Sequence, residues 1–226
     1  MTTHSDRVVL VHGAYADGSS WSEVIPLLED AGLEVVSVQH PLTTLQAGVE
    51  ATARALARSD QPTVLVGHSF AGSVITQAGS APNVSALVYV AARGPDAKED
   101  YTILASQFDP PPASSGLLWK DGYGRLSDEA FLRDFANGVP GHRARTLLAA
   151  QGPISAELFS HAPTVAAWRT IPSWYAISAD DRTINPELER HMAKRMGAET
   201  IELPAGHLSM ISHPRDIADL ILRAAA

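Results

Sequence analysis

The chain has 226 residues, 45% of them hydrophobic and 19% charged, which predicts one globular domain with a sizeable core and excludes a disordered chain. With 25 acidic and 17 basic residues the formal charge is −8, and no basic run is present that could neutralise a phosphate backbone, so nucleic acid is not an expected partner. The absence of cysteine excludes disulfides and thiolate metal sites.

The beginning of the chain bears on where the protein works. Residues 1–7 are polar, and the first apolar run, residues 8–11, is too short for the core of a signal peptide or for a membrane span. We therefore expect a cytoplasmic protein that does not associate with a membrane.

In chain order, short apolar runs rich in β-branched residues alternate with stretches of helical periodicity. The runs that we expect to form buried strands are residues 7–11, 34–38, 62–66, 85–90, 173–178 and 199–203. Because these runs are almost continuously apolar, they indicate a parallel sheet covered on both faces. Helices are expected from Trp21 to Gly32, from Leu45 to Leu56, from Asn185 as N-cap to Gly197, and around Ile217, Leu220, Ile221 and Ala224. This alternation predicts a doubly wound α/β fold.

The regular alternation stops between residues 93 and 169, where prolines separate short helical patterns and no strand is expected. Aromatic residues in this segment favour a packed structure over a loose surface excursion, namely Phe108, Trp119, Tyr123, Phe131, Phe135 and Phe159. We expect a single domain over residues 1–226, with a core of residues 1–92 and 170–226 and a helical cap of about residues 93–169. Caps over α/β sites commonly shape the pocket and exclude water.

A serine stands at the turn from the third expected strand into a helical pattern. Residues 64–73 are VLVGHSFAGS, so Ser69 follows an apolar strand, and Gly67 and Ala71 leave room for a sharp reversal. Such a turn exposes the hydroxyl above the sheet edge, and the helix N-terminus favours developing negative charge. Ser69 is the candidate nucleophile, and the alternative at this point is an ordinary tight turn.

The loop after the first expected strand, residues 11–18, is punctuated by glycines and leaves backbone N–H groups free near the expected position of the serine. We expect the N–H groups of Ala14 and Phe70 to form an oxyanion hole, in which each donor contributes about 3 kcal/mol of transition-state stabilisation. His12 in this loop is interpreted as a structural residue whose ring bonds to the backbone, rather than as a catalytic base.

Two carboxylates and a histidine follow the last two expected strands. Asp180 and Asp181 come directly after one strand, and His207 follows the other and a Pro-Ala-Gly turn. The order serine, acid, histidine is that of α/β hydrolases and differs from the orders in the two large serine protease folds. Asp181 is preferred as the acid, while Asp180 is expected to be a turn residue that bonds its own backbone. No histidine pair has carboxylates at metal-ligand spacing, so no metal is expected.

Four stretches together resemble one branch of the α/β-hydrolase superfamily, namely residues 11–21, 67–72, 179–186 and 206–214. They are similar to those of the methylsalicylate-type esterases, the hydroxynitrile lyases and small bacterial relatives, and the similarity extends over nearly the whole chain. The resemblance implies that the chain enters the fold at the third of the standard eight strands, which leaves six parallel strands. It also implies that Asp181, which precedes an Arg-x-Ile-x-Pro stretch, is the triad acid.

Departures from the patterns of related enzymes bear on the chemistry. Hydroxynitrile lyases of this branch have a lysine after the catalytic histidine and a threonine where this chain has Gly13. Here Leu208 follows His207, so a cation to hold cyanide is missing. Haloalkane dehalogenases and epoxide hydrolases of this fold use an aspartate nucleophile, and Ser69 argues against both.

The combined pattern predicts a serine hydrolase that cleaves small carboxylic esters or lactones through Ser69, His207 and Asp181, with no cofactor. The expected partner is a small-molecule ester, and the oligomeric state stays open, with a homodimer as one option. The same triad would also serve C–C bond hydrolysis or perhydrolysis, and ligand receptors of this fold keep it while turning over slowly, so these alternatives stay open.

The substrate pocket is expected to combine core and cap residues. Tyr15, Phe70 and Leu208 lie beside the expected triad, and Phe108 and Trp119 are the expected contributions of the cap. The apolar character of these residues favours an uncharged or aromatic substrate group.

Overall fold

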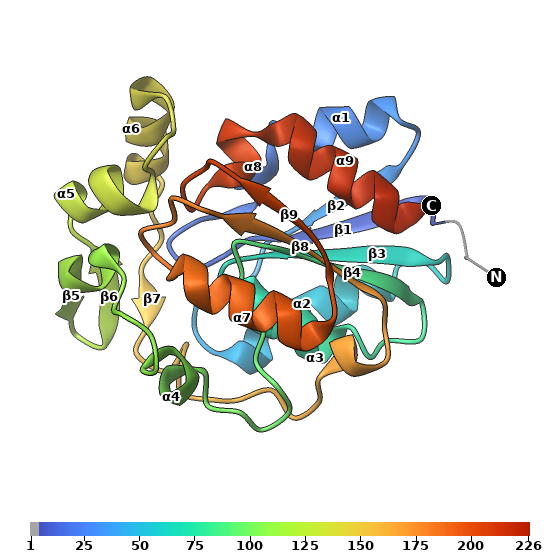
Figure 1. Cartoon of the computed structure of the whole chain (residues 1–226), viewed down its shortest axis with the longest axis horizontal. Coiled ribbons are helices and arrows are strands. Elements are labelled where there is room, and N and C mark those ends of the chain that lie inside the picture. Colours follow the sequence, from blue (N-terminus) through green and yellow to red (C-terminus); the bar gives the residue numbers. More distant parts are fainter. Residues whose placement is uncertain (1–4) are drawn as a thin grey trace.

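A six-stranded parallel sheet forms the centre of the molecule (Figure 1). The computed structural model describes residues 5–226, and residues 1–4, part of the polar start used to predict the localisation, lie outside this range. The strands have the spatial order β2-β1-β3-β4-β8-β9, and every neighbouring pair is parallel. Their bounds are β1 (Arg7–Val11), β2 (Glu34–Val38), β3 (Thr63–His68), β4 (Val84–Val90), β8 (Ser173–Ser178) and β9 (Glu199–Leu203). The predicted α/β fold is thereby confirmed.

Helices cover both faces of this sheet. In Figure 1, α1, α8 and α9 lie on one face, and α2, α3 and α7 lie on the other. Because both faces are covered, every residue of β1 and of β3 is buried, which explains the continuous apolarity of these strands. Within residues 5–226, no helix combines the length and the apolar character that a bilayer span requires. The helix bounds are α1 (Ile25–Asp30), α2 (Leu45–Leu56), α3 (Ala71–Ala78), α7 (Pro186–Met196), α8 (Ser209–Ser212) and α9 (Pro214–Ala225).

Local signals in the sequence set both ends of α7, which leads from the aspartate loop back along the sheet. Asn185 is its N-cap, with Oδ1 accepting a hydrogen bond from Glu187 N at 2.8 Å, and Pro186 occupies the first helical position. The helix ends at Gly197, whose φ of +64° is the left-handed conformation that glycine adopts without strain. The predicted bounds of this helix are confirmed.

The first predicted helix is divided into two pieces. A short 3₁₀ turn, η1 (Gly18–Trp21), precedes α1. Pro26 stands at the start of α1 and has no N–H to continue a helix from the preceding turn, so the periodicity that begins at Trp21 does not form one helix.

The cap lies beyond the carboxyl ends of the sheet strands, at the left of Figure 1. Its β5, β6 and β7 form a three-stranded antiparallel sheet, which corrects the expectation that residues 93–169 hold helices and no strand. The elements of the cap are α4 (Tyr101–Ala105), η2 (Pro112–Gly116), β5 (Leu117–Lys120), β6 (Tyr123–Leu126), α5 (Asp128–Ala130), the π-helical turn η3 (Phe131–Phe135), α6 (Gly141–Ala149), β7 (Ile154–Ser155) and η4 (Ala167–Arg169).

The cap sheet is built around a two-residue turn. Asp121 and Gly122 join β5 to β6 with φ angles of +50° and +80°, as in the hairpin turns that match the twist of antiparallel strands. An Asp-Gly pair between two short apolar runs is a local hairpin signal. The prolines and the helical spacing around this pair favoured helices, so the sequence analysis did not predict the hairpin.

Candidate active site

Ser69 occupies the sharp turn between β3 and α3. Its φ is +56°, in the left-handed region that a residue with a side chain rarely adopts. Three backbone hydrogen bonds hold this conformation: Ser69 N donates to Val90 O at 3.2 Å, and Ser69 O accepts from Gly72 N at 3.0 Å and from Arg93 N at 2.9 Å. Gly67 is needed at the entry of the turn, because a Cβ there would stand 2.8 Å from the carbonyl oxygen of Ala71. The turn places Ser69 in the wall of a cavity.

A histidine that follows β9 links this serine to a carboxylate that follows β8. His207 Nε2 lies 2.9 Å from Ser69 Oγ, and His207 Nδ1 lies 2.6 Å from Asp181 Oδ2. If Nδ1–H donates to the carboxylate, Nε2 is left to accept from the serine hydroxyl. The structure therefore brings together the three side chains that the sequence singled out.

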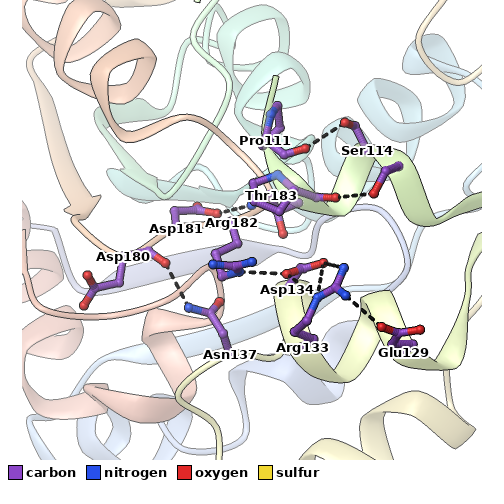
Figure 2. A network of polar contacts seen from close by, with 12 residues as sticks. Pro111, Ser114, Glu129, Arg133, Asp134, Asn137, Asp180, Asp181, Arg182 and Thr183 are labelled. Carbon is purple, nitrogen blue, oxygen red and sulfur yellow. Dashed lines mark hydrogen bonds and ion pairs between the residues drawn. The ribbon is translucent and has the colours of Figure 1, made fainter. Parts of the chain in front are cut away.

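Asp181, and not its neighbour Asp180, faces His207. Asp181 Oδ1 also accepts hydrogen bonds from the backbone N–H groups of Thr183 and Ile184, at 2.6 and 3.0 Å, so both carboxylate oxygens are held (Figure 2). Asp180 is exposed, as expected for a turn residue.

A second buried carboxyl group lies next to this carboxylate. Glu189 on α7 is fully buried, its Oε2 accepts a hydrogen bond from Ser178 N at 3.1 Å, and its carboxyl group also shares a hydrogen bond with that of Asp181. Burial, and next the negative charge of Asp181, raise the pKa of Glu189 well above its usual range. The neutral form of Glu189 is favoured, so one negative charge stands beside His207. The sequence analysis missed this residue.

Three further histidines hold loops around the site. His12 Nδ1 lies 2.9 Å from Gly13 O, and His40 Nε2 lies 2.9 Å from His12 O, while the two rings stack with centroids 4.1 Å apart. Burial, and next His40, lower the pKa of His12 to about 4, so its ring is neutral. His68 Nε2 lies 3.0 Å from His207 O. These contacts support a structural role for His12.

The loop after β1 packs directly against Ser69. A Cβ on Gly13 would stand 2.7 Å from Ser69 Cβ, so only glycine allows this approach. The next residue, Ala14, lines the cavity with Phe70. Within residues 5–226, the backbone N–H groups of Ala14 and Phe70 have no acceptor. Both donors are therefore available to an oxygen atom of a bound molecule.

The cavity beside Ser69 has a volume of about 270 Å³, near the lower end of ligand pockets. Of the residues predicted to line the pocket, Tyr15 and Phe70 do so. Within the described part of the chain, no three His, Asp or Glu side chains are grouped as a metal ion would require.

The structure does not bring the other three predicted pocket residues to this cavity. Phe108 packs against the ring of His191, with centroids 5.6 Å apart. Trp119 lies on the cap hairpin, where its ring covers Gly124 and is 49% exposed. Leu208 is buried and borders a separate small space behind the aromatic residues of η3. None of these three side chains lines the cavity beside Ser69.

The cavity is also lined by Arg93, Tyr101 and Phe159, none of which the sequence analysis predicted as a pocket residue. Arg93 had a usable signal, because it closely follows a buried strand and so lies at the carboxyl edge of the sheet, where ligands bind in such folds. Tyr101 and Phe159 lie in the irregular cap, and no local pattern shows which way their rings point.

Polar contacts fasten the cap to the loop after β8 (Figure 2). Asp134 in the cap is buried, and its carboxylate accepts hydrogen bonds from Arg182 Nε at 2.7 Å and from Arg133 Nη2 at 2.8 Å. These two arginines, Arg133 first, hold the pKa of Asp134 below its usual range. Asn137 Nδ2 donates to Asp180 O at 2.9 Å. The cap is thus attached to the same loop that carries the candidate acid.

The fold agrees with a comparison to known families. The model of the alpha/beta hydrolase family matches residues 8–220. The chain belongs to the alpha/beta hydrolase family. This membership confirms the resemblance to the superfamily seen in the sequence, and relatives named methylesterase 8 and polyneuridine aldehyde esterase each match the chain at 24% identity.

Relatives match over almost the full chain at low identity. The alpha/beta hydrolase nvfD of Aspergillus novofumigatus is 27% identical, and the match covers 96% of each chain. Salicylic acid-binding protein 2 of Nicotiana tabacum is 25% identical, again over 96% of each chain. The solved structure of polyneuridine aldehyde esterase has a TM-score of 0.84 at 19% identity, covers 98% of this chain and 100% of that chain, and shows the shared fold.

Proposed function

We propose that the protein is a serine hydrolase that cleaves small carboxylic esters or lactones through Ser69, His207 and Asp181. One observation carries this proposal: Asp181 Oδ2, the His207 ring and Ser69 Oγ are joined by contacts of 2.6 and 2.9 Å, on a serine with a φ of +56°. The relatives named pyrethroid hydrolase and polyneuridine aldehyde esterase support the same chemistry.

In the first half of the reaction, His207 Nε2 takes the hydroxyl proton of Ser69 while Oγ attacks the ester carbonyl carbon. Asp181 holds the ring in the tautomer with Nδ1–H and stabilises the imidazolium that forms. The N–H groups of Ala14 and Phe70 bind the negative oxygen of the tetrahedral intermediate. His207 then gives the proton to the leaving alcohol, and the acyl group stays on Ser69.

In the second half, a water molecule loses a proton to His207 and attacks the acyl group on Ser69. When the second tetrahedral intermediate collapses, the proton returns to Ser69 Oγ and the carboxylic acid leaves. Phe135 of the cap packs on the His207 ring, with centroids 5.2 Å apart. Ester and water thus give acid and alcohol, and the enzyme is regenerated.

Labelling with a fluorophosphonate, followed by peptide mapping, tests the nucleophile. We expect the probe on the peptide that contains Ser69 and no labelling of the Ser69→Ala variant. Ser73→Ala, on the helix that follows the turn, is the matched control and should be labelled like the unchanged protein. A label on another residue, or no label, would overturn the proposal.

Turnover of short p-nitrophenyl esters and of γ-butyrolactone tests the reaction. Steady turnover that disappears in Ser69→Ala supports the ester hydrolase. C–C hydrolases, perhydrolases and slow-turnover receptors of this fold share the triad, so the presence of the triad does not distinguish them from an ester hydrolase. The rates on these ester and lactone substrates make that distinction. Binding of the esters without turnover would favour the receptor and contradict the proposal.

A further inference from the structure

Arg93 places a positive charge in the wall of the cavity beside the candidate nucleophile. It follows closely after β4, at the carboxyl edge of the sheet. Its backbone N–H donates to Ser69 O at 2.9 Å, and its side chain lines the cavity together with Tyr15 and Tyr101. The strand and the serine turn therefore hold the backbone from which this charge extends.

Three aromatic rings surround the guanidinium group. Arg93 Cζ lies 4.0 Å from the centroid of Phe159, 4.4 Å from that of Tyr101 and 5.8 Å from that of Phe70. Aromatic faces attract a cation by about 0.5–2 kcal/mol, depending on exposure. An aromatic face does not accept directed hydrogen bonds as an oxygen atom does. The five N–H groups of the guanidinium can therefore still donate hydrogen bonds to a bound molecule.

In the part of the chain that the structure describes, no carboxylate pairs with this charge. Within residues 5–226, the Arg93 guanidinium has neither a hydrogen-bond acceptor nor an ion-pair partner. Glu99 and Asp100 border the smaller cavity on the other side of Arg93, but each is engaged elsewhere. Glu99 Oε1 binds Arg195 Nη1 at 2.7 Å, and Asp100 Oδ1 accepts from Thr102 N at 2.7 Å as the N-cap of α4.

Arg7 provides a comparison, because its guanidinium group is buried and has partners within the protein. Arg7 Nη2 donates to Ala55 O at 2.8 Å, and Arg7 Nε donates to Glu34 Oε1 at 3.2 Å. Burial lowers the pKa of Arg93, but a guanidinium titrates so far above neutrality that the group stays charged. Arg93 itself is only partly buried, and an anion bound in the cavity would pair with its charge and accept from its N–H groups.

We propose that Arg93 binds a carboxylate group of the substrate, so that the ester cleaved at Ser69 belongs to a molecule that also carries a free carboxylate. This inference rests on the proposed ester hydrolase function and names the substrate class of the same site. It replaces the expectation of an uncharged substrate group, which was based on the apolar residues alone.

A carboxylate fits the site better than other anions do. It carries one negative charge, which one guanidinium neutralises, and its two coplanar oxygens match the guanidinium fork. A phosphate monoester would bring a charge of about −1.5 to −2 to a single cation. Burial raises the pKa of Tyr15 to about 12 and that of Tyr101 above its usual range, so both phenols keep their protons and add neutral donors at the cavity wall.

A series of ester pairs tests this proposal. The monomethyl esters of succinic, glutaric, adipic and pimelic acid are compared with methyl alkanoates of equal chain length, with methanol release as the readout. We expect the anionic ester to exceed its neutral counterpart in kcat/KM by about 10–100-fold at the preferred length. The length at which this ratio peaks reports the distance from Ser69 Oγ to the guanidinium.

Variants at position 93 identify the group responsible for the preference. Arg93→Met should lower the anionic-to-neutral ratio by about 10–100-fold, and Arg93→Lys should keep part of it, because lysine supplies the charge without the planar fork. Arg145→Met, an exposed position on α6, is the control of equal charge change and should keep the full ratio. A ratio at or below one at every length, or an unchanged ratio in a folded Arg93→Met or Arg93→Lys variant, would overturn the proposal.

Binding to an inactive variant separates this proposal from the function on which it rests. Monomethyl adipate is titrated calorimetrically into Ser69→Ala and into the double variant Ser69→Ala/Arg93→Met. We expect affinity to fall by about 10–100-fold in the double variant. Loss of labelling and turnover with this difference intact would contradict only the hydrolase, whereas ester turnover without an anion preference would contradict only the carboxylate site.

Discussion

The sheet core and the cap differ in regularity and in what they add to the site. The core, residues 5–92 and 170–226, supplies the serine, the histidine, the aspartate and both candidate oxyanion donors, all from segments that follow parallel strands closely. The cap, residues 93–169, consists of short elements, of which the longest helix, α6, has nine residues. It carries the side chains that surround the guanidinium in the cavity, apart from Phe70.

The residues expected to carry out the reaction and those expected to select the substrate therefore lie in different kinds of structure. The ends of parallel strands are fixed by the hydrogen bonds of the sheet, which suits groups that must meet within hydrogen-bonding distance. The cap is fastened by a few polar contacts, of which the buried Asp134 is the centre. Substitutions in the core should therefore change the rate of the chemical step, and substitutions in the cap should change binding and local stability.

The largest effect is expected at the candidate acid. Asp181→Asn should lower kcat for p-nitrophenyl acetate by about 10⁴-fold, because the amide no longer holds the His207 ring in the required tautomer. Asp180→Asn changes the adjacent, exposed carboxylate and should keep kcat within about twofold. Comparable losses in both variants, with folding verified by circular dichroism, would contradict the assignment of Asp181 as the acid.

Acid should weaken the core through its buried histidines. The unfolded chain takes up a proton at His12 near pH 6.5, whereas the folded protein does so only near pH 4. The unfolding free energy should therefore fall by about 3 kcal/mol from His12 alone as the pH drops through this window, and it should recover as the pH rises. Urea unfolding at several pH values measures this slope.

A histidine outside the core provides the control for this pH dependence of the unfolding free energy. His12→Asn should be less stable at neutral pH but should lose less stability on acidification, while His142→Asn, at an exposed position of the cap, should keep the original slope. An equal change of slope in both variants would show that the acid response does not come from the core histidine.

A smaller effect is expected where the cap is fastened. Asp134→Asn should lower the unfolding free energy by about 1.5–3 kcal/mol, because it weakens the charge-assisted hydrogen bonds from Arg133 and Arg182. KM should rise more than kcat falls, since the chemical groups belong to the core. Asp128→Asn, whose partner Arg125 is exposed, should cost at most about 1 kcal/mol. A fall in kcat without a change in KM would contradict this division.

The smallest effect is expected at the second buried carboxyl. Because the neutral form of Glu189 is favoured, Glu189→Gln replaces one neutral group by another and should keep kcat within about threefold, with an unchanged pH profile. Glu189→Leu removes the acceptor of Ser178 N–H and should lower the unfolding free energy by about 1–3 kcal/mol. A shifted pH profile in Glu189→Gln would show that Glu189 carries a charge beside Asp181.

Most of the core could be predicted from sequence because its signals are local. The apolar runs predict the bounds of β1, β2, β8 and β9 to the residue, and Asn185 and Gly197 mark the ends of α7. The hairpin at Asp121 and Gly122 also had a local signal, which the surrounding helical patterns concealed. A short segment can match both the helix and the strand pattern, and in the cap the helix pattern gave the wrong prediction.

The amino-acid sequence by itself determined the doubly wound sheet and the order of serine, aspartate and histidine along it. Carboxyl ends of parallel strands meet at one edge, so residues just beyond them come together regardless of their separation in the chain. Only the tertiary structure decided that Arg93 reaches the cavity unpaired and that Phe108, Trp119 and Leu208 do not line it. The direction of these side chains depends on packing between residues far apart in the chain, which no local pattern encodes.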